Sequence, residues 1–252
     1  MQENKKISEA ENNTENTENV KNTENVKSTE NKIKPKKKSK ITIPSYTLGE
    51  ELLNSISHGV GALLGVAALV LCVVMAAINK NVWGVVSGSI YGASLVILYT
   101  MSTIYHALKV NRAKKVFRVI DHCSIYFLIA GTYTPYTLVT LRGGWGWTLF
   151  GIVWGAAILG ITLNAIDIKK FKVLSMITYL AMGWVIIIAI KPMLGAMAPG
   201  GLWFLLLGGI SYTIGAVLYG MGKKRRYVHG VFHIFVVIGS VLHFFSILFY
   251  VM

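Results

Sequence analysis

The stretch SISHGVGALLGVAALVLCVVMAAI, residues 55–78, contains one short polar cluster followed by an unbroken apolar run. An α-helix needs about 20 apolar residues to cross a hydrocarbon core about 30 Å thick. Six further runs of similar length follow it, and backbone groups cannot stay unpaired in lipid. The sequence therefore predicts an all-α integral membrane protein with a seven-transmembrane helix bundle. The seven spans are expected at about 55–78, 84–107, 118–140, 146–166, 172–193, 201–221 and 229–251.

The composition agrees with a membrane domain attached to a polar tail. Charged residues make up 14% of the 252-residue chain and the mean hydropathy is +0.55, whereas soluble domains carry about 25% charged residues. Nine of the eleven acidic residues precede Ser55. The net charge of +14 could indicate a nucleic-acid partner. We expect none, because the basic residues lie in short clusters between apolar runs, as in cytoplasmic loops.

The N-terminal segment differs from the rest of the chain. Residues 1–33 repeat Thr-Glu-Asn and offer almost nothing that could form a core, so we expect disorder. The segment KIKPKKKSK, residues 32–40, is expected to bind anionic lipid headgroups, with each basic residue contributing about 1 kcal/mol. We therefore divide the chain into a cytoplasmic tail, 1–46, and a membrane domain, 47–252. The long polar start shows no cleavable signal peptide, so the first apolar run is expected to remain as a span.

The loops between the apolar runs predict the orientation. Those after the second, fourth and sixth runs carry twelve basic residues: Lys109, Arg112, Lys114, Lys115, Arg118, Lys169, Lys170, Lys172, Lys223, Lys224, Arg225 and Arg226. The opposite loops carry three: Lys80, Arg142 and Lys191. Cytoplasmic loops are enriched in Lys and Arg. We therefore expect a multi-pass protein of the cell (plasma) membrane with its N-terminus in the cytoplasm and its C-terminus outside.

Several residues have structural interpretations. Close helix packing is expected at two ridges of small residues, one at Gly84, Gly88 and Gly92 and one at Gly151 and Gly155. Pro135 is expected to kink the third helix, and Asp167 to be a solvated loop charge. Cys72 and Cys123 form no metal motif and are expected to be packed thiols. Interfacial anchors are expected at Trp145, Trp147, Trp184 and Trp203.

The histidines gather at one depth of the predicted bundle. Five of the six fall near cytoplasmic helix ends: His58, His106, His122, His229 and His233. His243 lies ten residues beyond His233, which is about 15 Å further along a helix. Ionisable side chains are costly inside a membrane and are usually functional, so this gathering indicates a site.

The spacing of these histidines favours a metal site. His229 and His233 are four residues apart and share one helical face. A third imidazole, from His106 or from His58, would complete a three-histidine set that suits zinc and leaves a position for a reactive water. Asp121 would then act as base or orient the water, and Ser102, which shares a face with His106, could hydrogen-bond the reacting oxygen.

Simpler interpretations compete with a metal site. Two histidines share a helical face by chance in many helices, and an aspartate near a helix N-terminus often only caps it. His58 is equally consistent with a structural hydrogen bond to Glu50 or Glu51. The residues alone leave the choice between His58 and His106 open.

Four segments resemble the hemolysin III family. They are EELLNSISHGVGALLG (50–65), STIYHAL (102–108), DHCSIYFLIAGTYTPY (121–136) and HGVFHIFVVIGSVLHF (229–244). That family belongs to the superfamily of the progestin and adiponectin receptors, with alkaline ceramidases as more distant relatives. The resemblance implies a seven-helix domain with one Zn²⁺ per chain near the cytoplasmic side. It implies that His106, His229 and His233 are the zinc ligands, with Asp121 and Ser102 beside them.

Several functions are compatible with these features. The resemblance favours an intramembrane zinc-dependent hydrolase that acts on a membrane lipid amide or ester, as a ceramidase does. The family name suggests a cytolytic, pore-forming protein instead, but a chain with seven spans has no soluble toxin state. A membrane receptor or regulatory protein is a third possibility. An ion transporter ranks low, because the ionisable residues form no chain across the membrane. The sequence sets neither the substrate nor the oligomeric state.

Overall fold

The computed structural model describes residues 43–221 and 225–252. The chain divides into two units, residues 1–39 and 40–252, and the described residues all belong to the second. The predictions for the low-complexity tail and its basic segment therefore fall outside the described residues. The described elements are α2 (Leu48–Ile78), α3 (Val82–Ala107), α4 (Arg112–Pro135), η1 (Tyr136–Leu141), α5 (Gly143–Asp167), α6 (Lys172–Trp184), η2 (Val185–Ala189), α7 (Ile190–Ala196), α8 (Pro199–Met221) and α9 (Val228–Tyr250).

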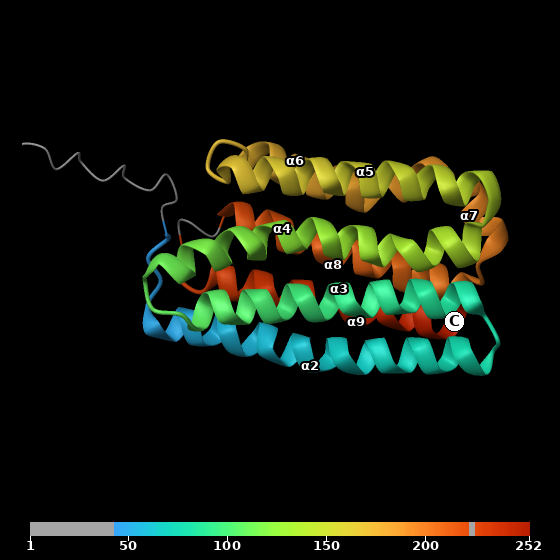
Figure 1. Cartoon of the computed structure of the whole chain (residues 1–252), viewed down its shortest axis with the longest axis horizontal. Helices are drawn as coiled ribbons and strands as arrows, with labels where there is room; N and C mark the ends of the chain where they lie inside the picture. The colour runs from blue at the N-terminus through green and yellow to red at the C-terminus, as the bar shows by residue number, and fades with distance from the viewer. Residues whose placement is uncertain (1–42, 222–224) are drawn as a thin grey trace, which may run out of the picture. The chain divides into compact units, whose positions relative to one another are not determined.

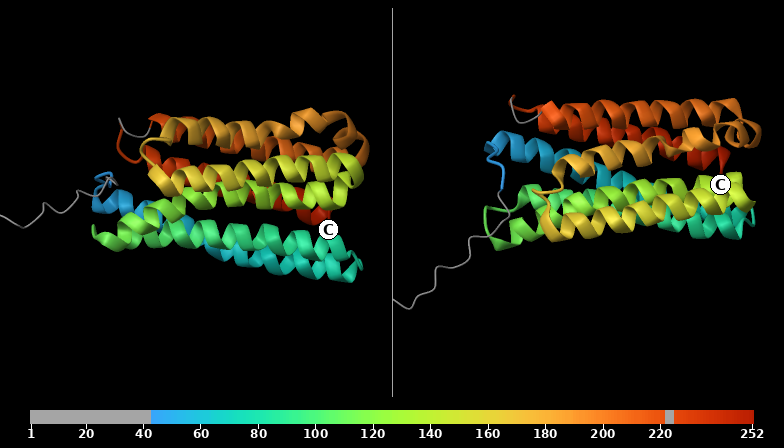
Figure 2. Two further views of the ribbon diagram at one scale, coloured as in Figure 1. Left: turned by 45° about the horizontal axis from the view of Figure 1, so that its top comes forward. Right: turned by 90° about the horizontal axis from the view of Figure 1, so that it is seen from above.

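The helices of this unit lie side by side along one long direction (Figure 1 and Figure 2). α2 packs against α3 and α9, α3 against α4, α4 against α5, and α8 against α9. The start of α2, the end of α3 and the starts of α4, α6 and α9 share one end of the bundle, on the left in Figure 1. We call this the histidine end, since it holds His58, His106 and His229.

Within residues 43–221 and 225–252, six segments are long and apolar enough to cross a membrane: α2, α3, α5, the stretch Lys172–Ala196, α8 and α9. Large apolar side chains cover the outside of the bundle, with Leu63 74%, Ile158 61% and Trp203 63% exposed. A soluble helix bundle rarely exposes so extensive an apolar surface to water. The described helices therefore form a multi-pass membrane bundle, and the predicted all-helical class is confirmed.

α4 is the predicted span that falls outside this count of six. Its sequence is less apolar because its first two turns carry four basic residues and because further polar side chains face the interior, where Asp121, Ser124, Thr132 and Thr134 are all buried. The threonine hydroxyls donate to carbonyls one turn earlier, Thr132 to Leu128 at 2.8 Å for example. Polar side chains that face the bundle interior lower the mean hydropathy of a helix, whether or not the helix crosses a membrane.

The predicted glycine ridge on α3 lies against α2. A side chain at Gly92 would overlap the backbone of Leu69, and one at Gly88 would crowd Cys72. These glycines let the two helices approach closely. The ridge predicted at Gly151 and Gly155 is wrong, because no described atom lies within 4 Å of a Cβ built at either position.

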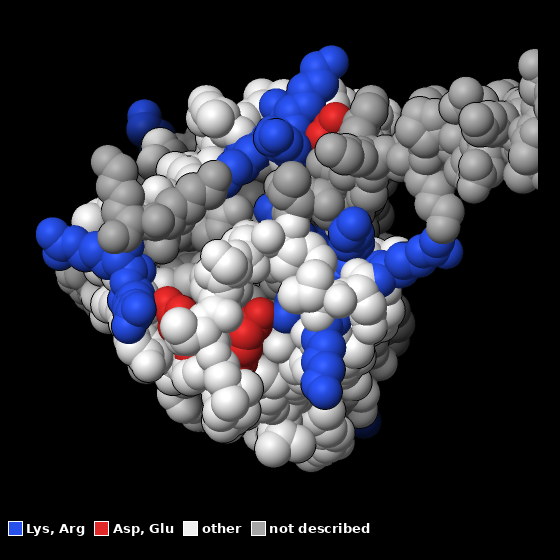
Figure 3. Space-filling model, turned by 90° about the vertical axis from the view of Figure 1, so that its left-hand side faces the viewer, with Lys and Arg blue, Asp and Glu red and all other residues white. Residues whose placement is uncertain are grey.

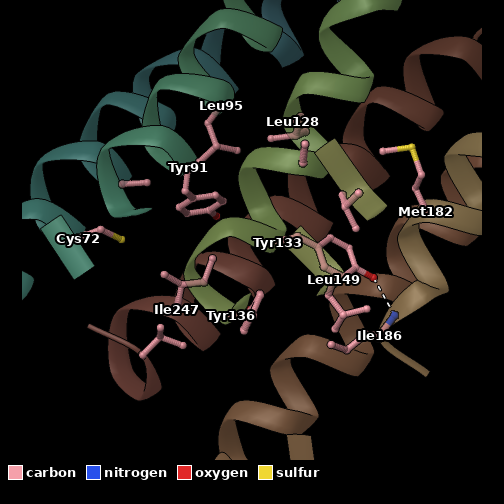
Figure 4. Packing of buried hydrophobic residues seen from close by; sticks show 14 of the residues in the cluster. Cys72, Tyr91, Leu95, Leu128, Tyr133, Tyr136, Leu149, Met182, Ile186 and Ile247 are labelled. Carbon is pink, nitrogen blue, oxygen red and sulfur yellow. Dashed lines mark hydrogen bonds between the residues drawn. The ribbon is translucent and has the colours of Figure 1, made fainter. Parts of the chain in front are cut away.

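Two irregular segments interrupt the regular helices. α4 ends at Pro135, the position at which the sequence predicts a kink, and the chain continues as the π-helical segment η1. Proline lacks the amide hydrogen that a regular helical turn donates, so the α-helix is interrupted there. The stretch after α6 becomes the 3₁₀ segment η2. Figure 4 shows Tyr133 reaching this break, where its hydroxyl donates to Gly183 O at 2.8 Å and accepts from Ile186 N at 3.2 Å.

The structure also shows the surroundings of Trp184, of the two cysteines and of Asp167. The anchor role expected of Trp184 is wrong, because its indole donates to Thr213 Oγ1 at 3.0 Å and lines an internal cavity. Cys72 is fully buried and Cys123 half-buried, and both are free thiols. Asp167 accepts from the amides of Lys169 and Lys170 at 3.0 Å and so caps the turn after α5.

Lys and Arg side chains gather on the face at the histidine end, with fewer Asp and Glu among them (Figure 3). The described basic residues there come from the loop after α3 and the first turns of α4, from the turn between α5 and α6 with the start of α6, and from the segment before α9. One of them is not at the surface, because Lys114 is only 2% exposed. The buried ammonium belongs to the histidine site described next.

Candidate metal centre and lipid cavity

Three histidines converge at the histidine end of the bundle. His106, His229 and His233 each offer one ring nitrogen, and these atoms lie within 4.8 Å of one another. His106 stands in the last turn of α3, while the other two occupy successive turns of α9 on one face. α2 brings these helices together, since it packs against both α3 and α9.

The donor set fits a tetrahedral zinc ion. The Nε2 atoms of His229 and His233 are 3.2 Å apart, and two nitrogens on one tetrahedral zinc lie about 3.3 Å apart when each Zn–N bond is about 2.0–2.1 Å. His106 Nε2 is buried and has no hydrogen-bond partner among the described residues. A buried polar atom without a partner calls for an explanation, and a metal ion supplies one.

The Glu51 carboxylate contacts the His106 nitrogen that faces away from the other two histidines, and the sequence did not predict this pair. Glu51 Oε2 lies 2.6 Å from His106 Nδ1, and Glu51 Oε1 lies 2.5 Å from the ammonium of Lys114. Lys114 also donates to Leu108 O at 2.9 Å. Metal-binding histidines commonly donate their second nitrogen to a carboxylate, which fixes the ring and its tautomer. The arrangement leaves His106 Nε2 to face the other two histidines.

His58 lies beside this group and is not one of the three converging histidines. Its ring stacks on that of His233, with centroids 3.7 Å apart and an interplanar angle of 12°. Both of its nitrogens are buried without a hydrogen-bond partner in the described part of the chain. The geometry thus groups His106, rather than His58, with the α9 pair, and the predicted alternative bond from His58 to Glu50 or Glu51 is not formed.

Tyr46, just before α2, covers the histidines from the end of the bundle. Its ring stacks on His229 with centroids 5.2 Å apart and lies 5.9 Å from His106. Burial raises the pKa of the Tyr46 phenol, and the nearby Tyr219 and Glu51 raise it further. The ring therefore stays neutral and screens the imidazoles from water.

Ser102 and Asp121 line the same cavity as His229 and His233. α2 and α3 are antiparallel, with Gly61 against Tyr99 and Gly65 against Leu95. The same register places Ser102 of α3 at the level of His58 of α2. The Ser102 hydroxyl is buried without a partner among the described residues.

Asp121 is 9% exposed and lies at the cavity wall on α4. Its Oδ2 lies 3.6 Å from Nδ1 of the neighbouring His122, whose Nε2 lies 3.3 Å from the Tyr219 hydroxyl. The carboxylate is thus held near the histidine cluster on a helix that carries none of the three converging nitrogens. Ser102 and Asp121, the two residues predicted to act beside the metal, therefore line the cavity together with His229 and His233.

The cavity has a volume of about 160 Å³ and extends from the histidines into the bundle. α4, α6, α8 and α9 form most of its wall, with apolar side chains such as Ile129, Leu180 and Val236. His243, which the sequence placed away from the other histidines, lines it as well. A largely apolar cavity that begins at a cluster of polar side chains suits a lipid chain with a polar head.

Comparison with known proteins agrees with this architecture. The family described as haemolysin-III related matches residues 46–244. This chain belongs to the haemolysin-III related family. The resemblance predicted from four sequence motifs is confirmed, and it places the chain among proteins related to the progestin and adiponectin receptors.

Curated relatives of this haemolysin-III related chain occur in bacteria and mammals. "Hemolysin-3 homolog" of Bacillus subtilis (strain 168) is 43% identical over 205 residues, 81% of this chain and 96% of the relative. "Hemolysin-3" of Bacillus cereus is 41% identical over 213 residues, 84% and 97% of the two chains. "Monocyte to macrophage differentiation factor" of Homo sapiens is 27% identical over 208 residues, 80% and 84%. No solved structure matches the chain.

Proposed function

We propose that this protein is an intramembrane zinc-dependent hydrolase of a lipid amide or ester. The observation that carries the proposal is the convergence of three histidine nitrogens at the polar end of an apolar cavity. The expected ligands are His106, His229 and His233, with one Zn²⁺ per chain. Zinc bound by three histidines with an open position activates water for attack on a carbonyl group.

The cavity residues have separate tasks in this proposal. The apolar wall binds the acyl chain and excludes bulk water from the carbonyl group. Ser102 donates its unpartnered hydroxyl to the carbonyl oxygen, where negative charge develops as water adds. Asp121 accepts a proton from the attacking water and passes it to the leaving nitrogen or oxygen as the bond to the acyl carbon breaks. A fatty acid and an amine or alcohol result.

We also propose seven spans, with α4 and η1 as the span that hydropathy omits. α3 ends at the histidine end of the bundle and α5 begins at the opposite end (Figure 1), so the chain between them must traverse the bundle. The basic residues at the histidine end support a cytoplasmic location for that end and for the N-terminus. The basic segment 32–40 would then lie against anionic lipids of the plasma membrane.

This orientation has a direct test in a variant without Cys72 and Cys123. A cysteine at Gly144, at the start of α5, should react with a membrane-impermeant thiol reagent added to intact cells. A cysteine at Lys169, in the turn after α5, should react only after the membrane is permeabilised. Reaction of Lys169→Cys in intact cells, with Gly144→Cys protected, would show the opposite orientation.

The reaction is tested with purified protein in lipid nanodiscs. We expect fatty acid, measured by mass spectrometry, to be released from at least one member of a panel of N-acyl lipids and acyl esters. Asp121→Asn should lower the rate by about 10²–10⁴-fold, as loss of a general acid–base group does, while zinc stays bound. Asp167→Asn removes an equivalent charge from the turn after α5 and should leave the rate unchanged.

Absence of turnover across the whole panel would contradict the hydrolase proposal. The relatives' name makes lysis of membranes the second candidate, and leakage of dye from protein-containing liposomes measures it. Leakage that persists after Asp121→Asn, without fatty acid release, would favour that candidate.

A further inference from the structure

His243 lines the cavity well away from the three converging histidines. It lies on α9 ten residues after His233, which is about 15 Å along the helix. Its side chain lines the cavity and the residue is only 6% exposed. The proposed hydrolysis needs no group at this depth, so the imidazole requires another explanation.

The surroundings hold the His243 ring in one orientation. A side chain at Gly208 on α8 would overlap the ring, so glycine there makes room for it. The ring of Tyr212 stacks on it, with centroids 5.2 Å apart and an interplanar angle of 24°. The Tyr212 hydroxyl is itself fixed at 2.7 Å from Ser240 Oγ, which also lies 2.6 Å from the hydroxyl of Tyr99.

The hydrogen bonds of this ring identify its free nitrogen as an acceptor. His243 Nδ1 lies 2.8 Å from Gly239 O, and a carbonyl oxygen only accepts, so Nδ1 carries the hydrogen. A neutral imidazole has one N–H, which leaves a lone pair at Nε2. A charged ring would be costly here, since the acidic residues of the described chain lie elsewhere, in the first turn of α2, in the first half of α4 and at the end of α5.

No described residue donates a hydrogen bond to His243 Nε2, whereas other polar groups at this depth are engaged. The Trp184 indole donates to Thr213, the Thr213 hydroxyl donates to Gly209 O, and the Tyr133 hydroxyl donates to Gly183 O. His243 Nε2 is therefore an oriented acceptor whose lone pair no described side chain at this depth uses. A ligand that satisfies it must carry an O–H or N–H group at that depth.

We infer that the cavity selects lipids whose hydrocarbon chain carries a hydroxyl group, which donates to His243 Nε2. The inference rests on the proposed function in one respect, because it places the polar head of the lipid at His106, His229 and His233. Ketone and ether oxygens only accept hydrogen bonds, so chains with these groups gain nothing at Nε2. Hydroxylated acyl chains are thus the substrate class that the site distinguishes.

The experiment measures binding, so it does not depend on turnover. Purified protein in nanodiscs is loaded with a fluorescent fatty acid, which is displaced by octadecanoic acid, by mid-chain hydroxyoctadecanoic acids of varied hydroxyl position, and by a mid-chain keto acid. We expect one hydroxylated isomer to bind roughly three- to tenfold more tightly than octadecanoic acid, the gain of one hydrogen bond. The keto acid should bind no better than octadecanoic acid.

Two variants assign the preference to the imidazole. His243→Phe keeps a flat ring against Tyr212 but removes the acceptor, and it should abolish the preference for the hydroxylated acid. Tyr212→Phe keeps the stacked ring and removes only the hydroxyl, so it should retain the preference. Comparing the three kinds of acid on the unaltered protein tests the inference even if a variant does not fold.

The outcomes separate this inference from the proposed function. Equal affinity for all of the acids, or a preference that survives His243→Phe, would overturn the inference. A preference that depends on His243, in a protein that hydrolyses no lipid of the panel, would support hydroxyl recognition and contradict only the hydrolase proposal.

Discussion

Replacing His229 or His233 with alanine will remove zinc from the purified protein, and His106→Ala will do the same. Each residue offers one of the three nitrogens that would hold the ion, and zinc held by two histidines alone lacks the coordination that sites in proteins provide. We expect one zinc per chain in the unaltered protein and close to none in each variant. Inductively coupled plasma mass spectrometry on dialysed, monodisperse protein measures the ratio.

His58→Phe is the matched control for this experiment. Phenylalanine preserves the flat ring that stacks on His233 but offers no nitrogen, so zinc should remain at one per chain. If zinc were lost in His58→Phe and retained in His106→Ala, the third ligand would be His58. If the unaltered protein held no zinc, the metal centre itself would be refuted.

The second large effect is expected from Glu51→Gln. The substitution keeps the size of the side chain but removes the charge that faces His106 and Lys114. The imidazole loses its anionic partner, and the buried ammonium is left without a counter-ion, which is strongly unfavourable. We expect zinc affinity to fall by about 10–100-fold, as measured by competition with a chelator of known affinity.

Glu50→Gln serves as the comparison, because Glu50 is the adjacent carboxylate. It bonds Thr47 in the capping box of α2 and accepts from the amide of Tyr227 at 3.0 Å, but it has no bond to a histidine. Its loss should lower thermal stability slightly and leave zinc affinity unchanged. An equal loss of affinity in both variants would mean that Glu51 acts through the general charge of this end, not through His106.

Much of the fold follows from the sequence because lipid imposes one constraint on every span. Apolar runs must become helices, and each predicted run matches helical structure, with α4 continued by η1 and α6 continued by η2 and α7. The α9 pair was also predictable, since residues four apart share a face whatever packs against them. α4 shows the limit of hydropathy, because its polar side chains face inward and lower its score without changing its place in the bundle.

The partners across helices could not be read from spacing within one helix. Glu51 pairs with His106 on α3, and His58 stacks on His233 of α9, because of how α2 packs between those two helices. Trp184 has the sequence position of an interfacial anchor, yet the break after α6 turns it toward α8. The ridge expected around Gly151 failed for the same reason, since a small-residue pattern does not name the helix that packs on it.

The three histidines and most of the cavity wall lie on different helices, so the two parts of the site can change independently during evolution. The three converging nitrogens come from α3 and α9 and are supported from α2, whereas α4, α6 and α8 supply most of the cavity wall. Substitutions on α6 and α8 can reshape the volume offered to a hydrocarbon tail without disturbing the imidazoles. Members of such a lineage can therefore differ in the shape of the cavity while keeping the same group of three histidines.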